Sequence, residues 1–250
     1  KNRLPKLIKK MIRLSKKFSS EHLRNITLYQ FLSKIFTDKN LSHFVIAFGY
    51  TAEIESLNAY DAIRLFKSSF SSQHTYFVLR GGLNQLIDKL KEKIIILGGK
   101  IRLNCSILDI KNLSSMYKIT YTNASGRRKK KITDQIILCI PQKQLMELNI
   151  MKPIHNVLQS VDSKCLLRIY AVYPVVDNTC WFSNIPKIAT NNILKFIIPI
   201  DSSKGLIMIS YSDSRYAKYW MNSNTNGTLK DDIQHELSKC FPKMNIPEPT

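Results

Sequence analysis

The stretch between residues 81 and 141 constrains the fold more than any other part of the chain. Apolar residues at helical spacing form one stripe there: Leu83, Leu86, Ile87, Leu90, Ile94 and Leu97. Gly98 and Gly99 follow, and glycine ends a helix readily because it accepts the left-handed conformation. Strand-like segments then occur at 100–104, 107–110, 117–122 and 132–140, with a turn at 123–131. The order predicts a helix, a strand and a three-stranded meander.

The flanking regions have a different character. Before residue 77, apolar residues recur at helical spacing over 4–18, 27–36 and 58–70. After residue 141, strand patterns at 166–173, 194–199 and 206–211 are followed by helical patterns at 214–220 and 228–241. With 250 residues, 44% of them hydrophobic, the chain is long enough and apolar enough to bury a core. We therefore expect an α+β protein built from the segments 1–76, 77–141 and 142–250.

The formal net charge of +20 is concentrated in two places. Residues 1–20 carry eight basic side chains and no acid, and Arg127 to Lys131 add five more. The predicted helix over residues 4–18 is both basic and amphipathic, which suits an acidic membrane surface or a nucleic acid. The alternative is that the abundance of Lys, Ile and Asn reflects a coding sequence rich in A and T. No zinc-finger, helix-turn-helix or RNP-type signature accompanies the charge.

Cysteine and histidine usage indicates neither disulfides nor a metal centre. The five cysteines include no Cys-x-x-Cys pair, and the five histidines include no His-x-x-x-His pair. We expect no metal and a reducing, intracellular and cytoplasmic location. No apolar run approaches the ~20 residues that span a bilayer, and the N-terminus lacks the apolar core of a signal peptide.

Three pieces of the central stretch resemble the flavin-containing amine oxidase family, which includes monoamine and polyamine oxidase-like proteins. They are the segment Phe77 to Leu86 that opens the helix, the strand-like Ile101 to Asn104, and the apolar run Ile136 to Pro141. They occur in the family's order over about 65 residues. The resemblance implies a helical plus mixed-sheet substrate domain formed by residues 1–76 and 142–250. This substrate domain is interleaved with an FAD-binding α/β domain, of which residues 77–141 are the second segment.

The resemblance also implies FAD as cofactor and suggests residues that contact it. Gly81 and Gly82 open the helix, and backbone groups at Ile107 match the position that meets the adenine end. The turn through Cys139, Ile140 and Pro141 matches the place where the family's chain leaves the nucleotide domain beside the cofactor. The alternative is that Ile107 and Ile140 are core residues only.

A second match covers the segment from Lys164 to Pro174 and the tryptophan that follows, Trp181. In many family members a lysine on this strand faces the flavin N5 through a water, and Arg168 occupies that position here. This is a departure, because arginine stays charged whereas lysine can lose its proton. The candidate catalytic residue is therefore Arg168, or Lys164 if the alignment of this strand is shifted. The alternative is that Arg168 only pairs with a surface acid.

Further roles are expected for three residues of the outer segments. Tyr50, in the predicted helices, and Trp181 are candidates for lining the substrate cavity, on the resemblance alone. Asp213 precedes the helical pattern at residue 214 and is expected to cap that helix.

The reaction implied is oxidation of a carbon–nitrogen bond of an amine, with hydride transfer to flavin N5. No Gly-x-Gly occurs among the eight glycines, so the family's pyrophosphate-binding loop is not in this sequence. We expect a partial copy of the fold, the middle of a longer protein, that binds FAD weakly or not at all by itself. The alternatives are a catalytically inactive oxidase-fold module, or a basic protein that binds nucleic acid or acidic membranes.

Overall fold

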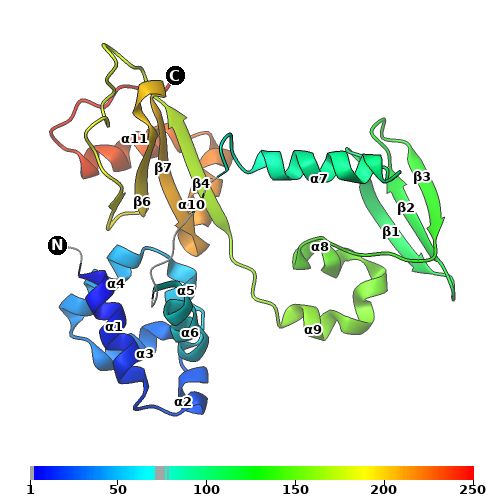
Figure 1. The fold of residues 1–250 in the computed structure, drawn as a ribbon, viewed down its shortest axis with the longest axis horizontal. Helices are drawn as coiled ribbons and strands as arrows, with labels where there is room; N and C mark the ends of the chain where they lie inside the picture. The colour runs from blue at the N-terminus through cyan, green and yellow to red at the C-terminus, as the bar shows by residue number, and fades with distance from the viewer. Residues whose placement is uncertain (1–2, 71–76, 78) are drawn as a thin grey trace. The chain divides into compact units, whose positions relative to one another are not determined.

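The computed structural model describes residues 3–70, 77 and 79–250, and the chain divides into two compact units (Figure 1). The first unit comprises residues 1–74 and 164–250, and the second comprises residues 75–163. Both combine helices with antiparallel strands, so the protein mixes helix and sheet as expected of an α+β fold. The expected boundary at residue 76 lies outside the described residues. Residues 142–163 belong to the second unit, and the assignment of segments to substrate and FAD-binding domains stays a prediction.

The N-terminal part of the first unit is helical. Its helices are α1 (Leu4–Ser15), α2 (Ser20–Arg24), α3 (Leu28–Ile35), α4 (Asp38–Phe48), α5 (Thr51–Glu55) and α6 (Ala59–Phe70). They enclose an apolar core in which Met11, Phe31 and Phe44 are fully buried. A capping box begins α3: the Thr27 hydroxyl accepts from the Gln30 N–H, and the Gln30 side chain accepts from the Thr27 N–H. The helical periodicity of the sequence is thus confirmed here.

The C-terminal part of the first unit is an antiparallel sheet with helices on one face. The strands are β4 (Leu166–Val172), β5 (Ile188–Ala189), β6 (Phe196–Asp201) and β7 (Leu206–Asp213), in the order β4-β7-β6-β5. The short helix η2 (Ser202–Lys204) joins β6 to β7, and α10 (Ser214–Asn226) and α11 (Leu229–Cys240) follow. Ile207, Ile209, Trp220 and Leu237 form the core between sheet and helices. One face of the sheet therefore packs against α10 and α11. The opposite face, which α10 and α11 do not cover, is called the open face below.

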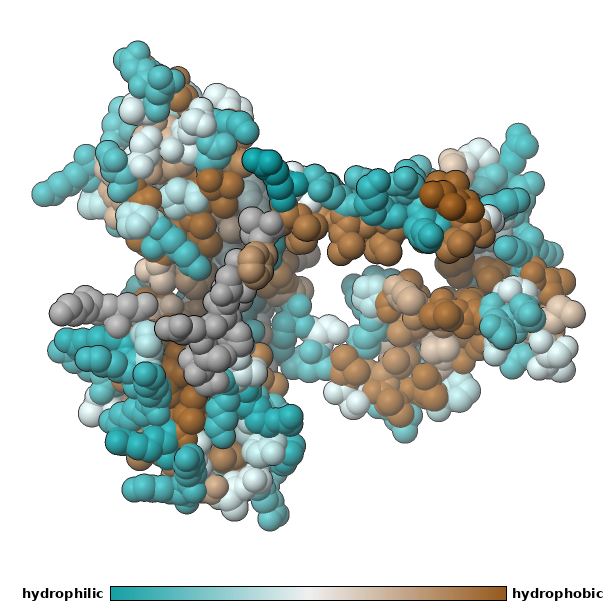
Figure 2. Space-filling view, viewed as in Figure 1, coloured by the Kyte–Doolittle hydropathy of each residue, from teal (hydrophilic) through white to brown (hydrophobic). Residues whose placement is uncertain are grey.

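The second unit contains α7 (Asn84–Ile96) and the meander β1 (Ser106–Asn112), β2 (Tyr117–Thr122) and β3 (Arg128–Thr133). The short helices α8 (Gln142–Glu147), η1 (Asn149–Ile154) and α9 (His155–Gln159) complete it. Gly98 follows α7 with a φ of 81°, so the predicted glycine stop is confirmed. No residue of α7 is buried, and Figure 2 shows apolar side chains gathered along one side of this helix.

Two predicted strands in this unit are wrong. Residues 100–104 are not a strand, and the segment predicted at 132–140 is strand only as far as Thr133. A strand needs a hydrogen-bonded neighbour, and no described segment pairs with residues 100–104 or 134–140. Their apolar residues remain exposed, as at Leu103 (71%) and Ile137 (87%). The predicted turn is also shorter, because Arg128 to Lys131 belong to β3 and pair with β2.

Two properties apply to the part of the chain that the structure describes. No helix in it is both long enough and apolar enough to cross a bilayer. Its five cysteines are all free thiols.

Candidate functional site

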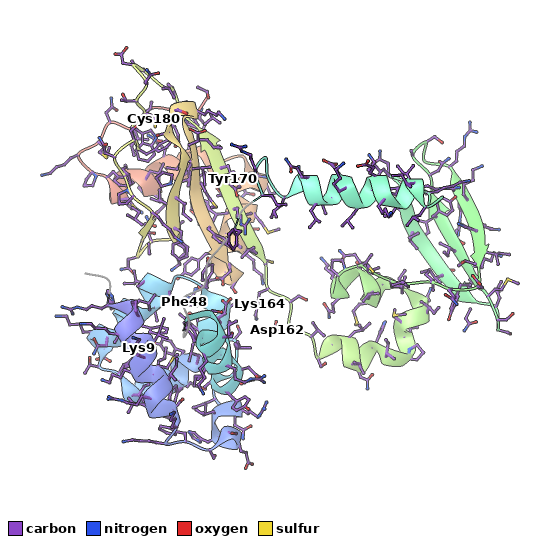
Figure 3. The ribbon with its side chains drawn as sticks, in the orientation of Figure 1. Lys9, Phe48, Asp162, Lys164, Tyr170 and Cys180 are labelled. Carbon is purple, nitrogen blue, oxygen red and sulfur yellow. The ribbon has the colours of Figure 1, made fainter. Side chains whose placement is uncertain are left out.

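The open face of the first unit's sheet is where the predicted residue Arg168 lies. Side chains alternate along β4, so that one set packs into the core with α10 and α11: Leu167, Ile169 and Ala171. Arg168 and Tyr170 belong to the opposite set, and Figure 3 labels Tyr170, whose residue is 51% exposed. The register pairs Arg168 with Tyr211 of β7, so these two side chains share the open face.

An aromatic wall formed by Tyr50, Phe196 and Tyr211 lies on this face. Tyr50 is contributed by the junction between α4 and α5, so the helical part of the unit completes a surface that begins on the sheet. Its ring centroid is 5.3 Å from that of Phe196 and 5.3 Å from that of Tyr211. The predicted substrate residue Tyr50 and the predicted catalytic residue Arg168 are therefore brought together through Tyr211.

Arg168 is held against this wall by its contact with Tyr211. Its Nη2 donates to the Tyr211 hydroxyl at 3.3 Å, and the guanidinium carbon lies 4.7 Å from the centre of the Tyr211 ring. The hydrogen bond to Tyr211 raises the pKa of Arg168 above its ordinary value. Arg168 is thus a permanent cation, suited to binding an anionic or hydrogen-bond-accepting group rather than to exchanging a proton.

Lys164, the second catalytic candidate, is not on β4. It lies two residues before the strand begins, in the exposed segment that leads into the sheet (Figure 3). The strand alternation that orients Arg168 does not extend to it.

The position of Tyr50 depends on two neighbours in the first unit. Gly49 has a φ of 76°, and a Cβ there would lie 2.4 Å from the Phe196 ring, so glycine allows the junction to approach β6. The carboxylate of Asp213 accepts hydrogen bonds from the N–H groups of Thr51 (3.1 Å) and Ala52 (2.9 Å) at the start of α5.

Asp213 was expected to cap the helix that follows it, and this is wrong. It occupies the N-cap position of α10, but its side chain makes no capping hydrogen bond there. The carboxylate caps α5 instead, and 162 residues separate it from Thr51. Arg215 adds a second link between helices and sheet through a two-pronged ion pair with Glu55, at 2.7 and 2.9 Å.

Two titratable groups at the junction have shifted pKa values. Burial raises the pKa of Tyr50 to about 12, and the neighbouring Tyr211 adds to the rise. Burial also raises the pKa of the Glu53 carboxyl, and the charge of Asp213 contributes in the same direction. One Glu53 oxygen, Oε2, is buried without a hydrogen-bond partner among the described residues. The junction therefore disfavours negative charge on both side chains.

A cavity of about 510 Å³ opens beside the aromatic wall. Phe48, Tyr50 and Phe196 supply its aromatic lining, and Lys187 supplies its charged group, with Nζ 5.2 Å from the centre of the Phe196 ring. Such a cavity can bind a compact ligand with an apolar body. A second cavity, of about 580 Å³, lies at the edge of β4 beneath α11 and contains none of the predicted site residues.

Trp181 is placed elsewhere. Its ring contacts Tyr173, Phe182 and Phe241, at centroid distances of 5.4 to 5.5 Å, within the core cluster that the covered face of the sheet shares. The structure therefore does not bring Trp181 to the aromatic wall beside Tyr50.

The residues predicted to contact FAD all lie in the second unit. Gly81 and Gly82 have φ values of 88° and 91° just before α7, a conformation that favours glycine. Ile107 is 49% exposed on β1, which is an edge strand. Cys139 is an exposed thiol, Ile140 is 40% exposed, and Pro141 is the N-cap residue of α8. Ile107 and Ile140 are thus not buried core residues.

These residues fit part of a dinucleotide site and not the whole of one. No described strand pairs with the outer edge of β1, so its backbone groups can meet a purine ring. Apart from the chain neighbours of Gly82, no described residue has an atom within 4 Å of a Cβ built there, so ligand atoms could approach. A pyrophosphate needs a glycine-rich loop at a helix N-terminus, and the sequence contains no Gly-x-Gly. The fit is therefore limited to the adenine end.

Comparison with protein families identifies the chain. The family model of the flavin containing amine oxidoreductases matches residues 5–250, which is nearly the whole chain. The protein belongs to this family. A search of the curated proteins found no match.

Sequence reasoning named Arg168 and Tyr50, which both contact Tyr211 in the structure, but it assigned no site role to Tyr211, Phe196 or Gly49. The strand alternation that orients Arg168 was visible in the sequence, and so was the strand that contains Tyr211. The register that pairs these two strands was not visible in the sequence.

No cluster of three or more His, Cys, Asp or Glu side chains capable of binding a metal ion occurs in residues 3–70, 77 and 79–250.

Proposed function

We propose that the protein is an FAD-dependent oxidoreductase that oxidises a carbon–nitrogen bond of an amine. The observation that carries this proposal is the family match over residues 5–250. In such an enzyme the flavin supplies the electron acceptor, and the protein binds, orients and desolvates the amine. The open face of the sheet is the part of this chain that suits the second task.

The aromatic wall and Arg168 have complementary roles in the proposed site. Tyr50, Phe196 and Tyr211 offer apolar surface that excludes water from the bound substrate. Arg168, stacked on Tyr211, offers fixed donors for an acceptor group on the substrate. Lys164 is retained as a second candidate on the family resemblance alone.

The charge of the site favours a neutral or acidic amine over a polyamine. Arg168 lies on Tyr211, and Lys187 lies over Phe196, so two cations flank the aromatic wall. At the junction beside Tyr50, burial raises the pKa of Glu53, which disfavours the negative charge that a cationic substrate would need there. Repulsion between the two cations and a polycation would weaken polyamine binding.

The residues within this chain are proposed to hold only the adenine end of FAD. We expect the 250-residue chain, purified and titrated with FAD, to show weak binding or none, because the pyrophosphate loop is not in its sequence. Tight, stoichiometric flavin in this purified chain would contradict that part of the proposal.

The reaction is tested on the protein expressed from its whole reading frame. Its flavin content is measured, and it is then mixed without oxygen with a panel containing a neutral amino acid, an acidic amino acid, a monoamine and a polyamine. The proposal predicts bound FAD that is bleached by at least one amine, with the polyamine the poorest reductant. Bound flavin that no amine bleaches would instead indicate an inactive oxidase-fold module, and a protein without flavin would overturn the cofactor assignment.

A further inference from the structure

The exposed side of α1 carries positive charge only. Seven cationic side chains lie in or beside this helix and none of its residues is acidic: Arg3, Lys6, Lys9, Lys10, Arg13, Lys16 and Lys17. All except Lys10 are exposed, and Figure 3 labels Lys9 on this helix. At 100° per residue, Lys6, Lys9, Arg13 and Lys16 fall within one quarter of the helix circumference. We call these four residues the basic stripe.

The opposite side of α1 is part of the first unit's core. Leu7, Ile8 and Met11 are 7%, 3% and 0% exposed, and they pack with residues of α3, α4 and α6. A helix that lies in a membrane interface buries its apolar face in the lipid. This face is already buried in protein, so the helix is rigidly held and has only its charge to offer a partner.

The charges of the basic stripe are not neutralised within the described residues. None of its four side chains forms an ion pair with a described acid. On α11, in contrast, Lys239 pairs with Glu236 at 2.7 Å, and two aspartates occupy the first turn. An ordinary solvated helix face carries both signs in this way.

The stripe also works against the stability of its own helix. Lys9 and Arg13 are an i,i+4 pair of like charge, and such pairs destabilise a helix. Lys6, in the first turn, adds a cation near the positive end of the helix dipole. A bound polyanion would relieve both repulsions.

We propose that the basic stripe of α1 binds the phosphate backbone of a double-stranded nucleic acid without sequence specificity. The helix has 12 residues and is therefore about 18 Å long, a length over which a duplex presents roughly ten phosphate charges. Side chains at helical spacing on one quarter of a rigid helix can reach several of these phosphates together. None of the four stripe residues lines the cavity beside the aromatic wall, and the proposal does not depend on amine oxidation.

The decisive variant is the double substitution Lys6→Glu and Lys9→Glu. It reverses two stripe charges, and it creates favourable i,i+4 pairs with Lys10 and Arg13, so the helix is expected to remain folded. The matched control reverses Lys129 and Lys131, two exposed residues of β3 in the second unit, and changes the net charge by the same amount. Circular dichroism and thermal unfolding verify that all three proteins are folded.

Binding of a labelled 20-base-pair duplex of random sequence is measured by fluorescence anisotropy between 50 and 300 mM KCl. With four phosphate contacts, the wild-type slope of log K against log salt is expected to be about −4, falling to about −2 in the stripe variant. At about 100 mM KCl the stripe variant should bind at least tenfold more weakly, and the control less than threefold more weakly. Separately, vesicles containing phosphatidylserine should bind the wild-type chain more weakly than the duplex does.

Three outcomes would overturn the proposal. One is no binding by the wild type at 50 mM KCl. Another is an equal loss in the stripe variant and the β3 control, which would mean that net charge alone is responsible. The third is stripe-dependent binding to the phosphatidylserine vesicles that exceeds binding to the duplex.

Discussion

The carboxylate of Asp213 ties the helical part of the first unit to its sheet, and replacing it tests that link. The residue is 4% exposed, and each of its two oxygens accepts one N–H group of α5. In Asp213→Asn one oxygen remains, while an amide NH₂ group faces the other N–H. The substitution therefore removes one charge-assisted hydrogen bond and leaves a buried donor without an acceptor.

The cost follows from these contacts. A hydrogen bond to a charged group contributes about 1.5–3 kcal/mol, and the charge at the helix N-terminus adds about 0.3–1 kcal/mol. Asp213→Asn should therefore lower the free energy of unfolding by about 2–4 kcal/mol. For a chain of this size that corresponds to a fall in Tm of roughly 5–10 °C.

Thermal unfolding by circular dichroism measures the effect, with Asp231→Asn as the matched control. Asp231 is an exposed aspartate in the first turn of α11, so its loss should cost no more than about 1 kcal/mol. Equal falls in Tm for the two variants would refute the reasoning, because the buried cap would then contribute nothing beyond a surface charge.

Three further predictions concern the same unit. Glu53→Gln should raise Tm at neutral pH, because the raised pKa of Glu53 means that its ionisation costs stability as pH increases above the ordinary value of 4.5. The gain in Tm should disappear below that pH, and a gain that stays the same across pH 4–8 would contradict this prediction. Gly49→Ala should destabilise by about 2–4 kcal/mol in urea unfolding, because the residue is left-handed and its Cβ would meet Phe196, and a neutral effect would show that the junction relaxes freely. Met11→Ala should cost about 2–4 kcal/mol in the same assay, since Met11 is fully buried, and a cost below about 1 kcal/mol would mean that the apolar face of α1 is not in the core.

Local patterns in the sequence predicted the elements whose contacts are close in the chain. The apolar spacing before Gly98 predicts α7 and its end, and the alternation at 117–122 predicts β2, because both depend on neighbouring residues. Residues 100–104 and 134–140 have strand-like composition but no strand, since pairing depends on a partner that the local pattern does not specify.

The candidate site was predictable only in part for the same reason. Arg168 was placed on a strand correctly, and family resemblance suggested Tyr50. Their proximity depends on the register of β4 against β7 and on a cap that spans 162 residues. The family resemblance also suggested Trp181 for the substrate cavity, whereas its ring packs in the core with Tyr173. Long-range contacts of this kind leave no periodic signal.

The open face bearing Arg168 is proposed to be the substrate side of a flavin-dependent amine oxidoreductase. Steady-state kinetics of the protein expressed from its whole reading frame, with the amine that best bleaches its flavin, test this assignment. Arg168→Ala is compared with Arg215→Ala, an arginine of the same unit whose partner is Glu55. Arg168→Ala should lower kcat/KM at least tenfold with flavin content unchanged, while Arg215→Ala should change it less than threefold. Equal kcat/KM values for Arg168→Ala and the wild type would contradict it.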